Sequence, residues 1–184
     1  ATLGTEEWCC GDHILRLGEK GLFETLAEHN VSMFEKLQAE KIVALSPHCY
    51  NTFKNDKPYR DAKLNVQHFT QFVAEKIEQG KLKLPKSIKK RVAYHDPCFL
   101  GKRNEVYAAP RQILESMNGL ELVEMKRTGE NSFCCGGGAG RVWTEEADSE
   151  RRPSVNRVRE ALGLDVETVV TACPFCVTTL EDAI

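Results

Sequence analysis

The chain has 184 residues, of which 28% are charged and 41% are hydrophobic, and its formal net charge is -2. A chain of this length suits one α/β domain or two small lobes. A near-neutral charge gives no electrostatic reason to expect nucleic acid as a partner. Because no apolar stretch approaches the roughly 20 residues of a membrane span and no signal-peptide pattern opens the chain, we predict a cytoplasmic protein.

The hydrophobic pattern alternates between helical and strand-like segments. The predicted elements are, in chain order, a helix at 22–39, a strand at 42–45, a helix that contains 69–77 and ends near 80, a strand at 92–94, a helix at 108–117, a strand at 120–125, a helix at 153–162 and a strand at 166–171. The mixed-charge run at 145–152 predicts an exposed loop. This alternation predicts an α/β fold with parallel sheets flanked by helices.

Five of the eight cysteines follow the spacing C-x35-C-C-x37-C-x2-C: Cys98, Cys134, Cys135, Cys173 and Cys176. Adjacent cysteines are poorly placed to form a disulfide with each other, because their Cα atoms are only about 3.8 Å apart. Five thiolates also exceed the four ligands of a tetrahedral zinc, whereas iron–sulfur clusters are held by cysteine sulfur. We therefore favour an iron–sulfur centre, with a disulfide framework as the weaker alternative because such frameworks belong mainly to shorter secreted chains.

The two halves of the chain resemble each other. Residues 41–53 align with 168–180, and Trp8-Cys9-Cys10-Gly11 aligns with Phe133-Cys134-Cys135-Gly136. We predict two pseudo-repeat lobes, 1–84 and 85–184, each a small parallel sheet flanked by helices, with the cysteines at the carboxyl ends of strands.

The first lobe is predicted to be degenerate. Ser46 stands where the second copy has Cys173, and the counterpart of Cys98 would fall before residue 1. The remaining candidate ligands are Cys9, Cys10 and Cys49, with His48 or His13 as nitrogen ligands. These could hold zinc, a poorer cluster or no metal.

Residues beside the cysteines are candidates for supporting roles. Gly136, Gly137 and Gly138 are not followed by Lys-Ser/Thr, so a phosphate loop is disfavoured. We expect these glycines to let the backbone approach a cluster and aim N–H groups at its sulfides. Cys173 precedes Pro174 at a predicted helix start, where the positive helix end should favour the thiolate.

The histidines and tryptophans carry weaker signals. His95, three residues before Cys98, is a candidate hydrogen-bond donor to cluster sulfur or a proton carrier, although a packed histidine is the commoner case. His29 and His68 fall in helical patterns and receive no role. Trp8 and Trp143 are expected to pack in the core or at its rim.

These motifs resemble a known family, the cysteine-rich CCG domain of heterodisulfide reductase B and D subunits and of iron–sulfur subunits in glycolate, lactate and glycerol-3-phosphate oxidising systems. The resemblance covers essentially the whole chain and is carried by Trp8-Cys9-Cys10-Gly11-Asp12, Ser46-Pro47-His48-Cys49, His95-Asp96-Pro97-Cys98, Cys134-Cys135-Gly136-Gly137-Gly138 and Cys173-Pro174-Phe175-Cys176. Within this family, the chain most resembles the C-terminal part of proteins that pass electrons between electron-transfer flavoprotein and quinone.

The resemblance implies a noncubane [4Fe-4S] cluster on the five second-lobe cysteines. It implies an iron–sulfur electron-transfer domain of a heterodisulfide-reductase-like oxidoreductase, which passes electrons between a flavoprotein or iron–sulfur partner and a quinone or thiol/disulfide acceptor. A membrane-bound quinone-reducing partner would place it at the cytoplasmic membrane. Two alternatives stay open: a zinc-stabilised docking domain of a larger redox complex, and a thiol enzyme that uses Cys173 and Cys176 as a redox pair.

Overall fold

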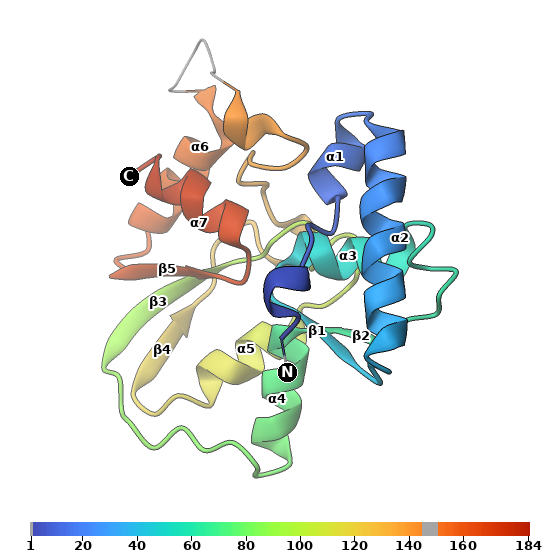
Figure 1. Cartoon of the computed structure of the whole chain (residues 1–184). Coiled ribbons are helices and arrows are strands. Elements are labelled where there is room, and N and C mark those ends of the chain that lie inside the picture. Colours follow the sequence, from blue (N-terminus) through green and yellow to red (C-terminus); the bar gives the residue numbers. More distant parts are fainter. Residues whose placement is uncertain (1, 145–150) are drawn as a thin grey trace.

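The computed structural model describes residues 2–144 and 151–184, and it is an α/β structure with two small parallel sheets (Figure 1). Most of the loop predicted at 145–152 lies outside the described residues. Three short 3-10 helices that lie wholly within the described ranges join the larger elements: η1 (Gly4–Glu6), η2 (Gly129–Asn131) and η3 (Arg141–Trp143). No helix in the described ranges is long and apolar enough to cross a membrane.

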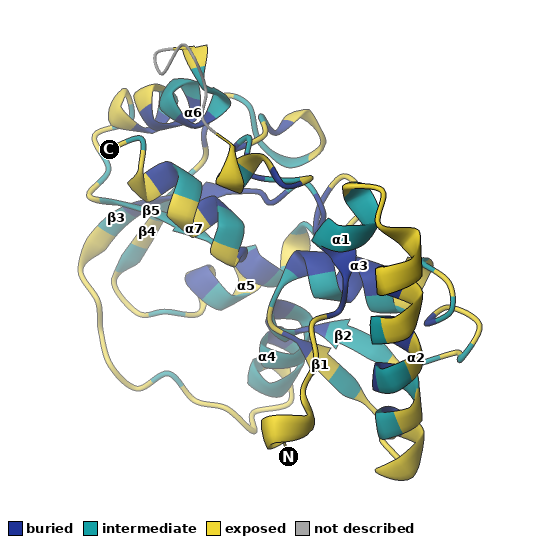
Figure 2. Ribbon diagram, turned by 45° about the horizontal axis from the view of Figure 1, so that its top comes forward, coloured by how far each residue is buried: buried dark blue, intermediate teal, exposed yellow. Residues whose placement is uncertain are grey.

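The amino-terminal half contains a two-stranded sheet and four helices. Strand β1 (Ile42–Ala44) pairs in parallel with β2 (Val66–His68), and the helices are α1 (Asp12–Arg16), α2 (Lys20–Lys36), α3 (Pro47–Asn55) and α4 (Phe69–Glu78). Helix α2 buries Phe23, Ala27 and Phe34 against Tyr59, while its outer face is exposed (Figure 2). This spacing is that of an amphipathic helix, so one apolar stripe fixes its orientation.

The carboxyl-terminal half contains a three-stranded parallel sheet. Strand β3 (Lys90–His95) lies between β4 (Leu120–Val123) and β5 (Thr168–Thr171), with Val92 opposite both Leu122 and Thr168. Helices α5 (Ala108–Glu115), α6 (Pro153–Leu162) and α7 (Pro174–Glu181) complete this half. The last four residues of β3 are all buried, as expected for a central parallel strand covered on both faces.

The two halves share a core. Ala44 and Tyr50 from the first half pack with Leu100 and Ala172 from the second, and α4 packs against α5. The ends of β1, β3 and β5 therefore converge on one region, where α3 and α7 begin. The cysteine-bearing loops leave the sheets at this junction.

Most sequence-predicted elements are confirmed in kind, with shifts at their ends. The elements that the sequence did not predict are short. Strand β2 and helices α1 and α3 were not predicted, and the prediction that His68 lies in a helical pattern was wrong: it ends β2 and caps α4 through a capping box with Gln71. Of the two positions expected for Trp8 and Trp143, core or rim, the core position is wrong, since these residues are 44% and 64% exposed.

Candidate metal centre

The five second-lobe cysteines come from three separate segments. Cys98 lies in the loop after β3, Cys134 and Cys135 lie between η2 and η3, and Cys173 and Cys176 lie at the start of α7. Cys173 is the N-cap residue of α7, and Pro174 follows as the first helical residue, where its missing N–H costs no hydrogen bond. The loops bring all five thiols to the carboxyl ends of β3 and β5.

The five thiols form a continuous series of contacts. The Sγ atoms of Cys135 and Cys176 are 3.2 Å apart. The thiol of Cys134 interacts with Cys98 and Cys135, and that of Cys173 interacts with Cys176. Cys135, Cys173 and Cys176 are buried, Cys98 is half-buried and Cys134 is exposed. All eight cysteines of the chain lie in the described ranges as free thiols, so the cluster of sulfurs is available to a metal.

Protons are unevenly shared within this series. Contacts with Cys135 and Cys98 hold the pKa of Cys134 far below its usual range, and contact with Cys176, helped by His48, lowers the pKa of Cys173 to about 5. The pKa values of Cys98 and Cys176 are raised by their thiol neighbours and by burial. Several thiols that compete for the same protons are a ligand set that a soft cation can deprotonate.

The glycines after the cysteine pair pack against protein as well as serving the thiols. The Gly136 N–H points at the Cys134 sulfur at 3.2 Å, and Gly136 has a left-handed φ of +87°. A Cβ atom on Gly137 would lie 2.7 Å from Cγ2 of Thr179, in α7. Glycine is therefore required here for close packing on α7, and the N–H groups of Gly136 and Gly137 contact the sulfurs of Cys134 and Cys135.

His95 ends β3 and is completely buried beside the thiols. Arg157 of α6 donates from Nε to Nδ1 of His95 at 3.0 Å, so the ring carries its proton on Nε2. Burial, and then the Arg157 charge, lowers the pKa of His95 to about 4. One ring nitrogen lies within 4.8 Å of the Cys135 and Cys176 sulfurs, and Nε2 has no partner among the described residues. A neutral ring of this tautomer is a hydrogen-bond donor rather than a metal ligand.

The loop that carries Cys98 is anchored by Asp96. Its carboxylate accepts two hydrogen bonds from Arg111, at 2.8 and 2.9 Å, and one from the Gly129 N–H at 2.9 Å. Burial opposes ionisation of Asp96, but Arg111 and Gly129 bring its pKa below the usual value. This bidentate pair fixes the exit of β3, and with it the position of Cys98.

The first lobe repeats part of this geometry. The thiol of Cys10 interacts with those of Cys9 and Cys49, and the Gly11 N–H points at the Cys9 sulfur at 3.4 Å, as Gly136 does at Cys134. Ser46 occupies the N-cap position of α3, where its hydroxyl accepts from the His48 N–H at 3.2 Å. Because Ser46 caps its helix at the position where the second lobe has Cys173, the first lobe has three thiols, those of Cys9, Cys10 and Cys49.

His48, a predicted nitrogen ligand of the first lobe, contacts residues of both lobes. Its ring stacks on Phe99 with centroids 4.1 Å apart, hydrogen bonds Asp12 and contacts Cys173 of the second lobe. His13, the other predicted nitrogen ligand, forms a group with Asp12 and His48 whose candidate ligand atoms lie within 4.8 Å of one another. Sequence reasoning missed Asp12 and Arg157. Asp12 directly follows the first Cys-Cys-Gly and was detectable from that position, whereas Arg157 carried no signal.

Comparison with known proteins accounts for this set of motifs. The family model described as a cysteine-rich domain, CCG, matches residues 1–54 and 92–181. The chain belongs to the CCG cysteine-rich domain family. Both matched segments contain a Cys-Cys-Gly loop.

Curated relatives of this CCG chain are longer proteins. It is 42% identical over 182 residues to a probable iron-sulfur-binding oxidoreductase, FadF, of Bacillus subtilis, which covers 99% of the chain and 26% of the relative. It is 39% identical over 188 residues to an EtfAB:quinone oxidoreductase of Syntrophomonas wolfei, covering 99% of the chain and 26% of the relative. It is 38% identical over 188 residues to the D-type subunit of the dihydromethanophenazine:CoB–CoM heterodisulfide reductase of Methanosarcina barkeri, covering 99% and 46%. The chain thus spans about a quarter to a half of these relatives.

Proposed function

We propose that this CCG chain is an iron–sulfur electron-transfer domain of a heterodisulfide-reductase-like oxidoreductase. The observation that carries the proposal is the continuous series of five thiols, with the Cys135 and Cys176 sulfurs 3.2 Å apart. Five adjacent thiols exceed the needs of one tetrahedral zinc and suit a centre with several irons. The names of the relatives, an iron-sulfur-binding oxidoreductase among them, support the same chemistry.

The residues of the second lobe fit such a group. Cys98, Cys134, Cys135, Cys173 and Cys176 would hold a noncubane [4Fe-4S] cluster, which when bound supplies one-electron redox chemistry. The Gly136 N–H and the His95 Nε2–H would donate hydrogen bonds to sulfur, and such donors adjust the reduction potential. The buried side formed by Cys173 and Cys176 keeps water away, while the exposed Cys134 marks the side nearest to a partner.

The proposed partners follow from the relatives. An EtfAB:quinone oxidoreductase supports a flavoprotein donor and a membrane-bound quinone-reducing partner, which would bring this domain to the cytoplasmic membrane. A relative from a heterodisulfide reductase supports a thiol/disulfide acceptor or an iron–sulfur partner instead. No nucleic-acid partner is proposed.

The first lobe is proposed to be a supporting lobe. Its division from the second at residues 84 and 85 falls between α4 and β3. Cys9, Cys10 and Cys49 with a serine at the fourth position would hold zinc or no metal. If zinc were the metal of the whole chain, the domain would be a structural docking module of a redox complex.

Metal analysis with EPR spectroscopy tests the proposal. Protein purified without oxygen should contain roughly four irons with matching sulfide and give an EPR signal in one oxidation state. Cys134→Ser should remove the iron and the signal. Cys9→Ser, the matched change in the first lobe, should retain both. A colourless, iron-free protein that is folded under these conditions would refute the proposal, and zinc alone would favour the docking module.

A further inference from the structure

The two Cys-Cys-Gly loops face each other across a local pseudo-twofold relation. In the repeat alignment, His48 corresponds to Phe175, and His13 corresponds to Gly138. Two contacts in the structure are related to each other by this alignment. The His13 and Phe175 rings have centroids 4.1 Å apart, and the ring of His48 is the nearest neighbour of Gly138, with Cε1 3.9 Å from its Cβ position. Each lobe therefore places the residue after its proline against the glycine loop of the other.

The lobes differ in chemistry at the matching positions. Gly137, which packs on the Thr179 methyl, corresponds to Asp12, and Thr179 corresponds to Thr52. In the first lobe the same contact is a hydrogen bond, from the Thr52 hydroxyl to Oδ1 of Asp12 at 3.1 Å. The second lobe thus has glycine and phenylalanine where the first has a carboxylate and an imidazole.

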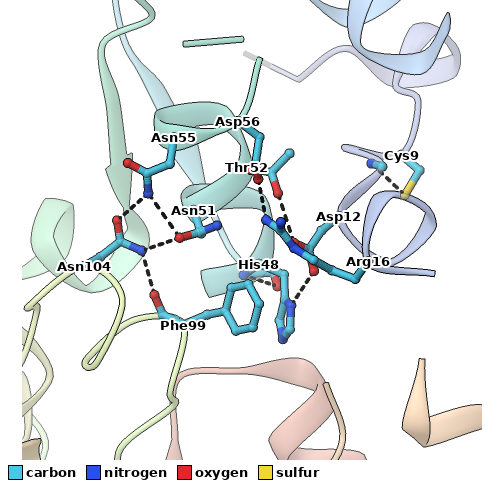
Figure 3. Close-up of polar contacts among 12 residues, drawn as sticks. Cys9, Asp12, Arg16, His48, Asn51, Thr52, Asn55, Asp56, Phe99 and Asn104 are labelled. Carbon is cyan, nitrogen blue, oxygen red and sulfur yellow. Dashed lines mark hydrogen bonds and ion pairs between the residues drawn. The ribbon is translucent and has the colours of Figure 1, made fainter. Parts of the chain in front are cut away.

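Asp12 fixes the ring of His48 (Figure 3). Its side chain is 0% exposed, and it accepts from Nδ1 of His48 at 2.7 Å, from Thr52 and from Nε of Arg16 at 3.2 Å. With Nδ1 held by Asp12, Nε2 is the nitrogen left for the Cys173 sulfur that the ring contacts. A ligating thiolate and a carboxylate both only accept hydrogen bonds, so a ring between them carries a proton on each nitrogen.

Helix α3, which carries His48, also supports Cys98 at the other end of the thiol series. Nδ2 of Asn104 donates to Oδ1 of Asn51, in α3, at 3.0 Å and to the Phe99 carbonyl at 2.7 Å. Phe99 directly follows Cys98. Helix α3 of the first lobe therefore contacts the Cys98 loop through Asn51, as Figure 3 shows, and Cys173 through His48.

We propose that His48, oriented by Asp12, is a positioning residue through which the first lobe donates a hydrogen bond to Cys173 and raises the reduction potential of the second-lobe centre. This inference rests on the proposed iron–sulfur function. A donor to a ligand sulfur stabilises the reduced, more negative state more than the oxidised one, so it raises the potential. The degenerate lobe would then act on its neighbour's centre instead of holding one of the same kind.

A metal ion at Asp12, His13 and His48 is the competing occupant of this group. Their candidate ligand atoms lie within 4.8 Å of one another. However, Asp12 already accepts from a guanidinium, a hydroxyl and an imidazole, and the Arg16 charge 3.2 Å away repels a cation. The contacts therefore favour the hydrogen-bonded arrangement.

Redox titration followed by EPR tests the inference on the iron-loaded protein. His48→Phe copies the residue of the second lobe and should lower the potential by at least about 59 mV, a tenfold change for one electron. Asp12→Asn should shift it in the same direction, and His48→Gln, which keeps a donor, should restore part of the difference. His29→Phe, in α2 and outside the thiol series, is the matched control and should leave the potential unchanged. An unchanged potential in His48→Phe with iron still bound would overturn the inference.

Two further measurements separate the alternatives. In metal-free protein, long-range ¹H–¹⁵N NMR should show Nδ1 of His48 protonated and hydrogen-bonded to Asp12, which is the ring orientation that directs Nε2 at Cys173. A ring protonated on Nε2 alone would overturn the inference even if iron were never found. One zinc per chain that is lost in His48→Phe would assign the group to a cation and refute the hydrogen bond. Iron-free wild-type protein would defeat the proposed function alone, because the NMR result does not depend on iron.

Discussion

At the scale of single residues, the buried Arg157 makes several of the contacts that hold the site together. Its guanidinium is completely buried, donates to His95 and to the Arg127 carbonyl at 2.8 Å, and pairs with Glu160 at 3.1 Å. A buried charge is tolerated only when its partners are well placed, and removing it strands those partners without water. Arg157 therefore sets the tautomer of His95 through a contact that is also important for the stability of the fold.

We expect Arg157→Met to destabilise the protein by about 3 kcal/mol, because His95 Nδ1 and the Arg127 carbonyl lose their donor and Glu160 loses a charge partner. Urea denaturation of the metal-free protein measures the change. Arg159→Met, an exposed position on the same helix, is the control and should cost much less. Equal losses in the two variants would show that Arg157 has no special role.

The five cysteines could be predicted as ligands from the sequence. Ligands of one metal centre must lie close together in space, and the spacing of these cysteines is typical of such a centre. His95 was found because it precedes Cys98 by three residues. Arg157 could not be found in the same way, since it is separated from His95 by 62 positions and lies in an ordinary helical pattern. Only the packing of α6 on β3 makes them neighbours.

At the scale of elements, α3 and α7 show how one local design serves two purposes. Both helices begin with proline after an extended N-cap residue, Ser46 in one and Cys173 in the other. Ser46 uses its side chain for capping, whereas Cys173 keeps its sulfur for the thiol series. Strand β2 was missed because three residues are too few for a period-two pattern to be recognised.

We expect Gly137→Ala to destabilise the protein by roughly 2 kcal/mol, since the new Cβ would lie 2.7 Å from the Thr179 methyl. The double variant Gly137→Ala/Thr179→Ser should recover most of the loss, because serine removes the methyl and keeps the hydroxyl bonded to the Phe175 carbonyl. Thermal and urea unfolding report both effects. Gly21→Ala, which meets no atom within 4 Å, should be neutral or stabilising, and no recovery in the double variant would place the clash elsewhere.

At the scale of the whole molecule, His68 lies where the two halves meet. Its ring faces the carbonyls of Leu45, after β1, and Ala172, after β5, and it is 0% exposed. Burial lowers its pKa to about 4 from the ordinary 6.5. The ring is therefore neutral in the folded protein at neutral pH. Protonation of this buried ring at low pH would destabilise the contact between the two halves.

We expect the free energy of unfolding to fall by about 2 kcal/mol between pH 7 and pH 5 through His68 alone. Below pH 6.5 the unfolded chain takes up a proton that the folded chain refuses until about pH 4, so stability is lost as pH falls through this window. His68→Gln should flatten the slope measured by urea denaturation at the two pH values. The partly exposed His29, changed to Gln, serves as control, and an unchanged slope in His68→Gln would contradict the expectation.

The placement of the thiols in three distant segments has a consequence for biogenesis. Cys98 and Cys176 come together only after β5 has joined β3 in the parallel sheet, a non-local pairing that forms slowly. A nascent chain therefore offers no complete ligand set while it leaves the ribosome. For the proposed ligands, a complete set exists only once β5 lies beside β3, so any delivery machinery would act on a lobe whose three-stranded sheet has formed.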